Sequence, residues 1–234
     1  MRTTLKQPMR FFLAPQKKLP NNEDLIMKKI HLLAITLLFS SPIFAKEWAF
    51  DVFLDKTKMG THTFTLSESN QMISRAKFNV KVLFINAYNY NHVSKEQWKD
   101  GCLTSIDADT TEKKVVSKVA GKLEGEQFNI TSGTQTQNLP ACVMTFAYWN
   151  PKTLTQSKLL NPQNAEYLDT KIKQIGIETI DVKGKPTETA HYVLQGLSEG
   201  KTKLNIDLWY DQNKNWVALQ STTPEGYKVI YKLK

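Results

Sequence analysis

The sequence predicts a mainly β protein: an antiparallel sheet of about ten strands, strongly curved or rolled into an open half-barrel, with one short helical insert. Three observations lead to this fold class. From about residue 46 onward, most apolar residues alternate with polar ones, as in strands with one buried face. Polar turns, many of them containing Gly or Asp, separate these runs at short intervals. The exception is 139–163, whose apolar residues do not alternate.

The first two runs, 48–54 and 61–66, flank a polar turn that contains Gly60, which is typical of a β-hairpin. His62 falls on the same face as Phe64 in the second run. Two interpretations of this histidine stay open. Its ring nitrogens either find partners at the edge of a core, or they point as polar groups into a cavity.

The most informative run begins at Phe78. If the strand stays regular, one face passes from aliphatic and aromatic residues to aromatic residues with polar tips. This gradient is typical of the mouth of a ligand pocket, and equally of a strand that leaves the core for solvent. The residues of this face are Phe78, Val80, Val82, Phe84, Asn86, Tyr88, Tyr90 and His92.

Further strands follow in chain order. We expect short strands within 105–130, a polar loop over 131–138, and two short strands around Gly176. Residues 189–233 predict a four-stranded meander, because four alternating runs are separated by polar turns.

The non-alternating segment predicts a helical insert over about 141–160. Two helical turns fit 141–149, after which Asn150 is a good N-cap and Pro151 a good first residue of a second helix. The Asn-Pro step at 161–162 ends it, because the residue before a proline is pushed out of the α region. The insert would cover the concave face of the sheet with its aromatic residues Phe146, Tyr148 and Trp149.

Residues 1–45 predict an N-terminal extension and a secretory signal peptide, with a hydrophobic core at 30–39 and cleavage after Ala45. The alternative, a membrane anchor, needs about 20 apolar residues, and this run is shorter. Translation from Met27 stays open. The mature chain, 46–234, would then be a single periplasmic domain, and not an integral membrane protein.

Removal of the leader lowers the formal charge. The whole chain carries +9, whereas 46–234 holds 24 Lys and Arg against 20 Asp and Glu. Arg75 is the one arginine among them. Proteins that read nucleic acid depend on arginine forks and a clustered basic face. We therefore expect no nucleic-acid partner.

The two cysteines, Cys102 and Cys142, suggest a disulfide in an oxidising compartment. The alternative is two separate buried thiols. A bridge would tie the start of the insert to the sheet and leave its far end, 159–163, free to move as a lid.

Motifs for chemistry are sparse. The sequence from 46 onward has three widely spaced histidines and no zinc-type spacing, nucleophile elbow or phosphate-binding loop, so we expect no metal and no cofactor. Cys142 as a nucleophile would need a histidine at an unknown distance. The leading hypothesis is a carrier that binds a lipid or another apolar or amphipathic small molecule. Its expected ligand-binding residues are His62, Tyr88, Tyr90, His92, Phe146, Tyr148 and Trp149.

Two other functions stay open. A hydrolase acting on envelope material would need polar residues such as His62, His92 and Glu96 to converge in one pocket. A structural envelope protein, with another envelope protein as partner, would have a filled core and no ligand.

Four strings resemble a bacterial family of exported proteins known as domain of unknown function 6134. They are WAFDVFLDKTKMGTHTF, YNYNHVSKEQWKDGCL, CVMTFAYWNPKTLTQSKLLNPQ and IDLWYDQNKNWVALQS. The resemblance covers nearly all of 46–234 and implies no activity, because the family has none assigned. It also leads us to expect Gly after Pro-Gln, where this chain has Asn164, a residue that tolerates positive φ. A looser analogy, based on fold class alone, links a curved exported sheet to half-barrel carriers of lipids and lipoproteins.

Overall fold

The structure is a computed structural model that describes residues 45–82, 85–223 and 225–234. The predicted signal peptide therefore lies outside the described residues, which begin at Ala45, the expected cleavage position. The described part of the chain forms fourteen strands and one short 3₁₀ helix. They are β1 (Lys46–Leu54), β2 (Thr57–Leu66), β3 (Gln71–Val82), β4 (Ile85–Lys99), β5 (Cys102–Glu112), β6 (Val115–Glu124), β7 (Gln127–Ser132), β8 (Gln135–Pro140), η1 (Pro151–Thr155), β9 (Lys158–Leu160), β10 (Tyr167–Val182), β11 (Lys185–Ser198), β12 (Lys201–Asp211), β13 (Trp216–Thr222) and β14 (Lys228–Leu233).

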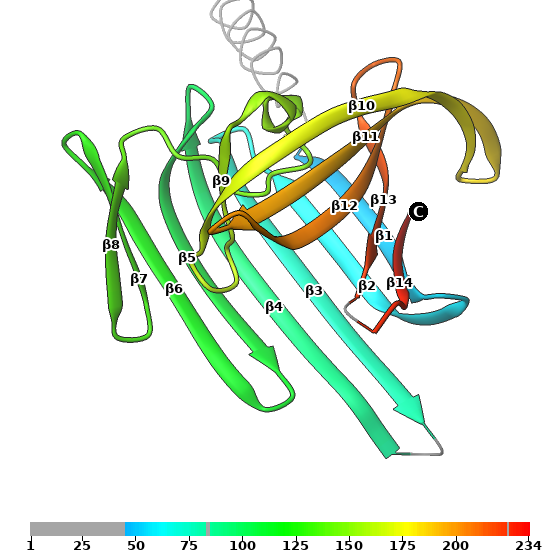
Figure 1. Cartoon of the computed structure of the whole chain (residues 1–234), viewed down its shortest axis with the longest axis horizontal. Helices are drawn as coiled ribbons and strands as arrows, with labels where there is room; N and C mark the ends of the chain where they lie inside the picture. Colours follow the sequence, from blue (N-terminus) through cyan, green and yellow to red (C-terminus); the bar gives the residue numbers. More distant parts are fainter. Residues whose placement is uncertain (1–44, 83–84, 224) are drawn as a thin grey trace, which may run out of the picture. The chain divides into compact units, whose positions relative to one another are not determined.

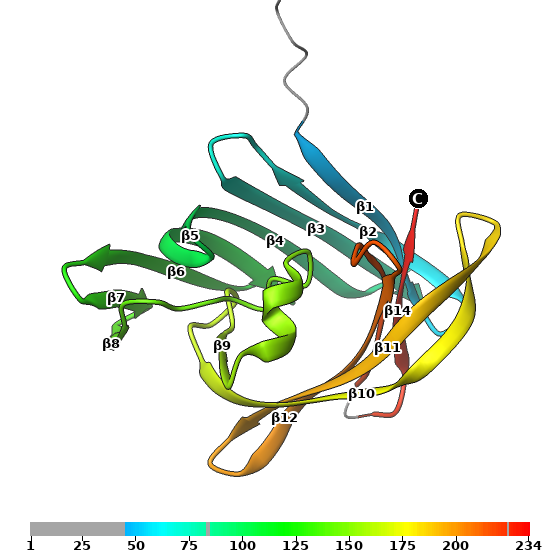
Figure 2. The same ribbon diagram turned by 90° about the horizontal axis from the view of Figure 1, so that it is seen from above.

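All fourteen strands belong to one antiparallel sheet, which confirms the predicted fold class with more strands than the ten expected. β1 to β8 form one meander and β9 to β14 a second, and β1 pairs with β14 to join them. The sheet stays open, with β8 and β9 at its two edges. Figure 1 shows β1–β8 as a broad tilted sheet crossed by β10–β12, and Figure 2 shows β10–β12 curving around the insert. The right-handed twist between neighbouring strands allows one sheet to roll in this way.

The core lies on the concave face of the rolled sheet, because alternate residues of most strands point there. Trp48, Phe50 and Val52 of β1 have exposed fractions of 4%, 0% and 0%. The rings of Phe50 and Trp216, from the two meanders, lie 4.3 Å apart between centroids. Burial of an aromatic side chain of this kind stabilises the fold by about 2 to 3 kcal/mol. Such contacts hold the two meanders together.

The run that begins at Phe78, predicted as one strand, is a hairpin. β3 ends at Val82, β4 begins at Ile85, and these two residues pair with each other. Phe78 and Tyr90, which were expected on one strand, therefore face each other from two paired strands. The prediction was wrong because no Gly, Pro, Asn or Asp marks a turn between Val82 and Ile85. The side chains of 81–87 lie outside the described part, and with them Val82, Phe84 and Asn86 of the predicted face.

Two other segments also differ from the prediction. The polar segment predicted as a loop over 131–138 includes the turn and parts of both strands of the β7–β8 hairpin, with Gly133 at a φ of 58° in the turn. The two short strands expected around Gly176 are one strand, β10, with a bulge between Gln174 and Gly176. The predicted meander over 189–233 is confirmed as β11–β14.

The insert contains much less helix than predicted. Its helical part in the described residues is η1, where Pro151 stands in the first turn and the Asn150 side chain accepts a hydrogen bond from the Lys152 amide at 3.1 Å. This cap is the one predicted. None of the described helical residues forms a segment long and apolar enough to span a bilayer.

The two helical turns expected over 141–149 are absent, and that segment is irregular. Its backbone groups bond to neighbouring strands instead: the Val143 carbonyl accepts from the Leu103 amide at 2.8 Å, and the Met144 carbonyl from the Leu160 amide at 2.9 Å. The turn after Pro162 survives as expected, but the positive φ of 63° falls on Ala165 and not on Asn164.

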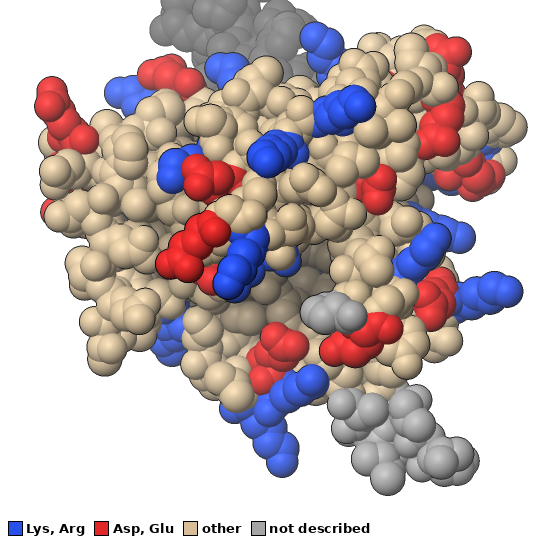
Figure 3. All heavy atoms as spheres, viewed as in Figure 1, with Lys and Arg blue, Asp and Glu red and all other residues tan. Residues whose placement is uncertain are grey.

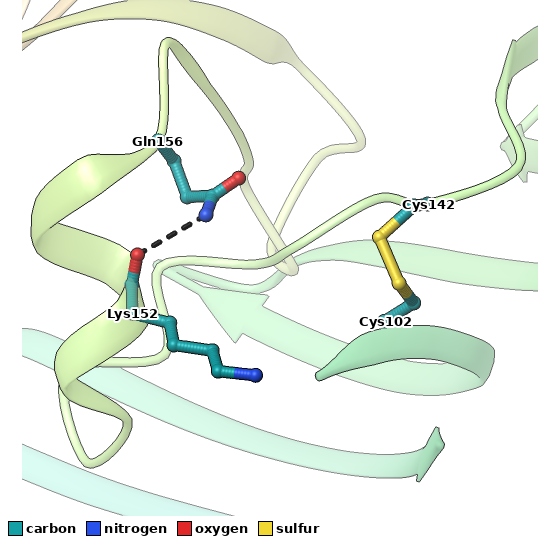
Figure 4. Close-up of a disulfide and its surroundings, with 4 residues drawn as sticks. All are labelled: Cys102, Cys142, Lys152 and Gln156. Atoms are coloured by element: carbon teal, nitrogen blue, oxygen red, sulfur yellow. Dashed lines mark hydrogen bonds between the residues drawn. A yellow bond between two sulfur atoms is a disulfide. The ribbon is translucent and has the colours of Figure 1, made fainter. Parts of the chain in front are cut away.

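A disulfide joins Cys102, at the start of β5, to Cys142, at the start of the insert, with Cα atoms 4.9 Å apart (Figure 4). The bridge is as predicted, but the lid is not. Leu159 and Leu160 at the far end of the insert are fully buried, and β9 pairs there with β10. The insert is therefore fixed at both ends.

Candidate functional site

A cavity of about 370 Å³ lies on the concave face of the sheet. Strands β2–β4 form its floor, β12–β14 its opposite wall, and the insert covers one end. Its volume is within the range of small-molecule sites, roughly 300 to 1,000 Å³. Figure 3 shows a hollow in the face of the molecule that β12 crosses, with lysine and acidic side chains around its edge.

The floor of the cavity is polar although it is buried. Ser74 of β3 lies directly opposite Ser94 of β4, with exposed fractions of 7% and 1%. His92 and Glu96 stand two residues to either side of Ser94 and are 3% and 5% exposed. His92, Ser94 and Glu96 point to the same, concave face, because side chains alternate along a strand. The floor is thus a row of hydrogen-bonding groups shielded from bulk water.

Glu96 is the one acidic group of this floor. Its Oε1 accepts a hydrogen bond from the Ser94 hydroxyl at 3.2 Å, and its Oε2 accepts from Trp98 Nε1 at 3.1 Å and from the Thr145 hydroxyl at 3.2 Å. Burial raises the pKa of the carboxyl to about 7, although the three donors favour the charged form. The carboxyl also ties the insert to β4 through Thr145.

The two histidines of the cavity are both neutral at physiological pH. His62 contacts the Ser74 hydroxyl through Nε2 at 2.7 Å and the Tyr231 hydroxyl through Nδ1 at 3.2 Å. His92 contacts the Thr110 hydroxyl through Nδ1 at 2.8 Å. Desolvation lowers the pKa of His62 to about 3 and that of His92 to about 4. Both ring nitrogens of His62 thus have partners, as in the first of the two interpretations, although the residue also lines the cavity.

The insert closes one end of the cavity with Phe146, Tyr148 and Trp149. The Tyr148 carbonyl accepts a hydrogen bond from the Tyr210 hydroxyl of β12 at 2.7 Å. The Trp149 ring packs between two buried tryptophans of the sheet, at centroid distances of 6.1 and 5.5 Å. These contacts make the cover a fixed wall.

The mouth of the cavity is polar and exposed. Lys203 and Asn205 of β12, Thr222 of β13 and Gln163 of the turn after β9 line this side. The other lining residues are mostly apolar. Phe64 and Met72 lie on the floor strands beside Ser74 and Glu96, and the opposite wall includes Leu204, Ile206, Leu219 and Val229.

Five of the seven residues expected to bind ligand line this cavity, namely His62, His92, Phe146, Tyr148 and Trp149. Tyr88 and Tyr90 are not among the lining residues. Tyr90 stacks on Phe78 at 5.2 Å, and Tyr88 stacks on Tyr90 at 6.4 Å. Burial raises the pKa of both phenols.

Sequence reasoning missed Ser74, Ser94, Thr145 and Tyr231, and it named Glu96 only for a hydrolase. The signal for Ser94 and Glu96 was present: both continue the even-numbered face of β4 beyond His92. Ser74 and Tyr231 come from strands whose pairing no local pattern reveals.

The third histidine of the described residues lies outside the cavity. His191 Nε2 contacts Asp207 at 2.7 Å and its Nδ1 contacts Glu178 at 3.1 Å, across β10–β12. Within the described residues, no group of three or more His, Cys, Asp or Glu side chains is arranged to hold a metal ion.

These features define an open, barrel-like antiparallel β protein with a lined internal cavity. The chain belongs to the family described as Domain of unknown function (DUF6134), whose model matches residues 50–234. This confirms the family that the sequence resembles. No curated protein matches the chain.

Among solved structures, the fold is similar to that of a β-barrel-like protein of domain of unknown function DUF1849 from Brucella abortus. The TM-score is 0.61 and the sequence identity 12%, and the alignment covers 83% of this chain and 97% of the other. At this identity the likeness concerns the fold alone.

Proposed function

We propose that this protein is an exported periplasmic binding protein that carries an apolar or amphipathic small molecule in the cavity of its rolled sheet. The observation that carries the proposal is the cavity of about 370 Å³, lined by apolar side chains and by a few buried polar groups on its floor. Apolar walls with a few placed polar groups are typical of ligand sites. A core that served only for structure would lose contact energy by leaving such a space open.

Two features support the proposed compartment. The segment 27–45 has the basic, apolar and small-residue parts of a signal peptide. The disulfide between Cys102 and Cys142 is of the kind that persists in oxidising compartments such as the periplasm. Cell fractionation of the tagged full-length protein should place it in the periplasmic fraction, shortened by the leader. Recovery of the uncleaved chain from the cytoplasm would contradict this part of the proposal.

Ligand binding is tested with a matched pair of variants on one strand. Ser221 lines the cavity from β13, whereas its neighbour Gln220 points to the other face. Ser221→Trp should fill the cavity and reduce uptake of a small uncharged fluorescent amphiphile at least tenfold, and Gln220→Trp should leave uptake unchanged. Native mass spectrometry of gently purified wild-type protein should show a bound small molecule. Consistently empty wild-type protein without probe uptake would refute the proposal.

A second candidate, a hydrolase, is favoured by one specific observation. His62, His92 and Glu96 do converge on the same cavity, and the Glu96 carboxyl lies 3.2 Å from the Ser94 hydroxyl. A carboxyl with a pKa of about 7 suits a general base. Against this, imidazoles with pKa values of about 3 and 4 are weak bases.

Ester hydrolysis separates the two candidates. A hydrolase would turn over a p-nitrophenyl ester, and Glu96→Gln would reduce the rate at least a hundredfold while the variant still bound the substrate analogue. A binding protein would take up the ester without turnover. We expect the second result.

A further inference from the structure

The cavity's size and the placement of its polar groups specify its ligand more closely. We propose that it takes one single-chain amphiphile, with an uncharged hydrogen-bonding head against Ser74, Ser94 and Glu96 and the chain directed to the mouth. The inference rests on the proposed binding function and adds the class and the orientation of the ligand.

The cavity is small. Its volume of about 370 Å³ lies near the lower end of the range for small-molecule sites, roughly 300 to 1,000 Å³. The space therefore suits one short chain, and most of a two-chain phospholipid would stay in water.

The orientation follows from the position of the buried polar groups. Ser74, Ser94 and Glu96 lie at the floor with exposed fractions of 7%, 1% and 5%. Ser94 donates its proton to Glu96, and Ser74 bonds to His62 Nε2, but a serine hydroxyl oxygen has two acceptor lone pairs. A head with a hydroxyl, an amide or a protonated carboxyl can therefore donate to these oxygens, whereas a hydrocarbon end cannot. The chain then lies along Leu204 and Val229 toward the mouth.

The charge of the floor selects a neutral head. Glu96 is the acidic group there, and the imidazoles of His62 and His92 are uncharged at pH 7 because desolvation lowers their pKa values. A sulfate or phosphate placed among them would be a buried anion beside a carboxyl, which is strongly unfavourable. Lys203, which could pair with an anion, lies exposed at the mouth.

The experiment compares probes with the same chain and different heads. Titration of the disulfide-bonded protein with dodecanol should show saturable binding. Dodecyl sulfate, below its micelle concentration, should bind at least a hundredfold more weakly. Didecanoyl phosphatidylcholine should not be taken up. Ser94→Ala should weaken dodecanol binding about tenfold, because one hydrogen bond is lost, and Lys95→Ala, next to it on the opposite face, should leave the affinity unchanged.

The outcomes separate this inference from the proposed function. Dodecyl sulfate binding as tightly as dodecanol, with a loss in Lys203→Ala and none in Ser94→Ala, would overturn the orientation while leaving a binding protein. Tight binding of the phospholipid would overturn the size limit alone. Failure of every probe, including the fluorescent amphiphile, would overturn both proposals. Should Ser94→Ala unfold, Ser74→Ala on the facing strand provides the same test.

Discussion

The buried carboxyl of Glu96 should make the stability of the protein fall as the pH rises. Its pKa is about 7 in the folded protein and 4.5 in an ordinary setting. Between these pH values the folded state binds more protons than the unfolded state, so the free energy of unfolding decreases with increasing pH. At 1.36 kcal/mol for each pKa unit, the whole effect amounts to about 3 kcal/mol.

Glu96→Gln removes this dependence and retains the shape of the side chain. The amide oxygen can still accept from Trp98 and Thr145, and the amide nitrogen can donate to the Ser94 hydroxyl. We therefore expect the variant to gain about 2 to 3 kcal/mol over wild type between pH 5 and pH 8. Urea denaturation at both pH values measures the difference.

The histidines titrate in wild type and variant alike, so their contributions cancel in this difference. Glu166→Gln, which changes an exposed carboxyl on the turn before β10, serves as the control and should show no such gain. If the free energies of unfolding of Glu96→Gln and wild type differ by an amount that changes by less than about 1 kcal/mol from pH 5 to pH 8, Glu96 is not a buried, proton-binding group.

Three further predictions concern the fold. Replacing Cys102 and Cys142 together by serine should lower the free energy of unfolding by about 4 kcal/mol, because the bridge closes a loop of some 40 residues; a change below 1 kcal/mol in urea denaturation would contradict this. Gly60→Ala should lower the free energy of unfolding by about 2 to 3 kcal/mol or more, because the added Cβ would lie 1.9 Å from a backbone carbonyl oxygen of β3. Gly176→Ala, which has open space around it, should be tolerated. Thermal unfolding of both variants measures the difference. Burial lowers the pKa of His62 from 6.5 to about 3, so below pH 6.5 the unfolded chain binds a proton that the folded protein does not. The free energy of unfolding should therefore fall as the pH drops below 6.5. His62→Gln should reduce this dependence on pH.

Much of the fold could be predicted from local patterns. The alternation over 48–54 placed Trp48, Phe50 and Val52 correctly on the buried face, because alternation is a property of one strand and its two environments. The Asn150 cap was equally local, since it involves neighbouring residues only. The prediction failed where local signals were missing or misleading. Val82 pairs with Ile85 although the sequence between them has no Gly, Pro, Asn or Asp. The insert is irregular because its amides and carbonyls bond to β5 and β9.

The sequence by itself determined the β class, the pairing of the two cysteines, the family and five of the residues that line the cavity. It did so because alternation, spacing and motif strings are read along a single segment. Only the tertiary structure decided which strands are neighbours, and this brought Ser74, Ser94 and Glu96 together with Tyr231 from the far end of the chain. The shift in the pKa of Glu96 has the same origin, because desolvation depends on everything that packs around a group and not on its neighbours in sequence.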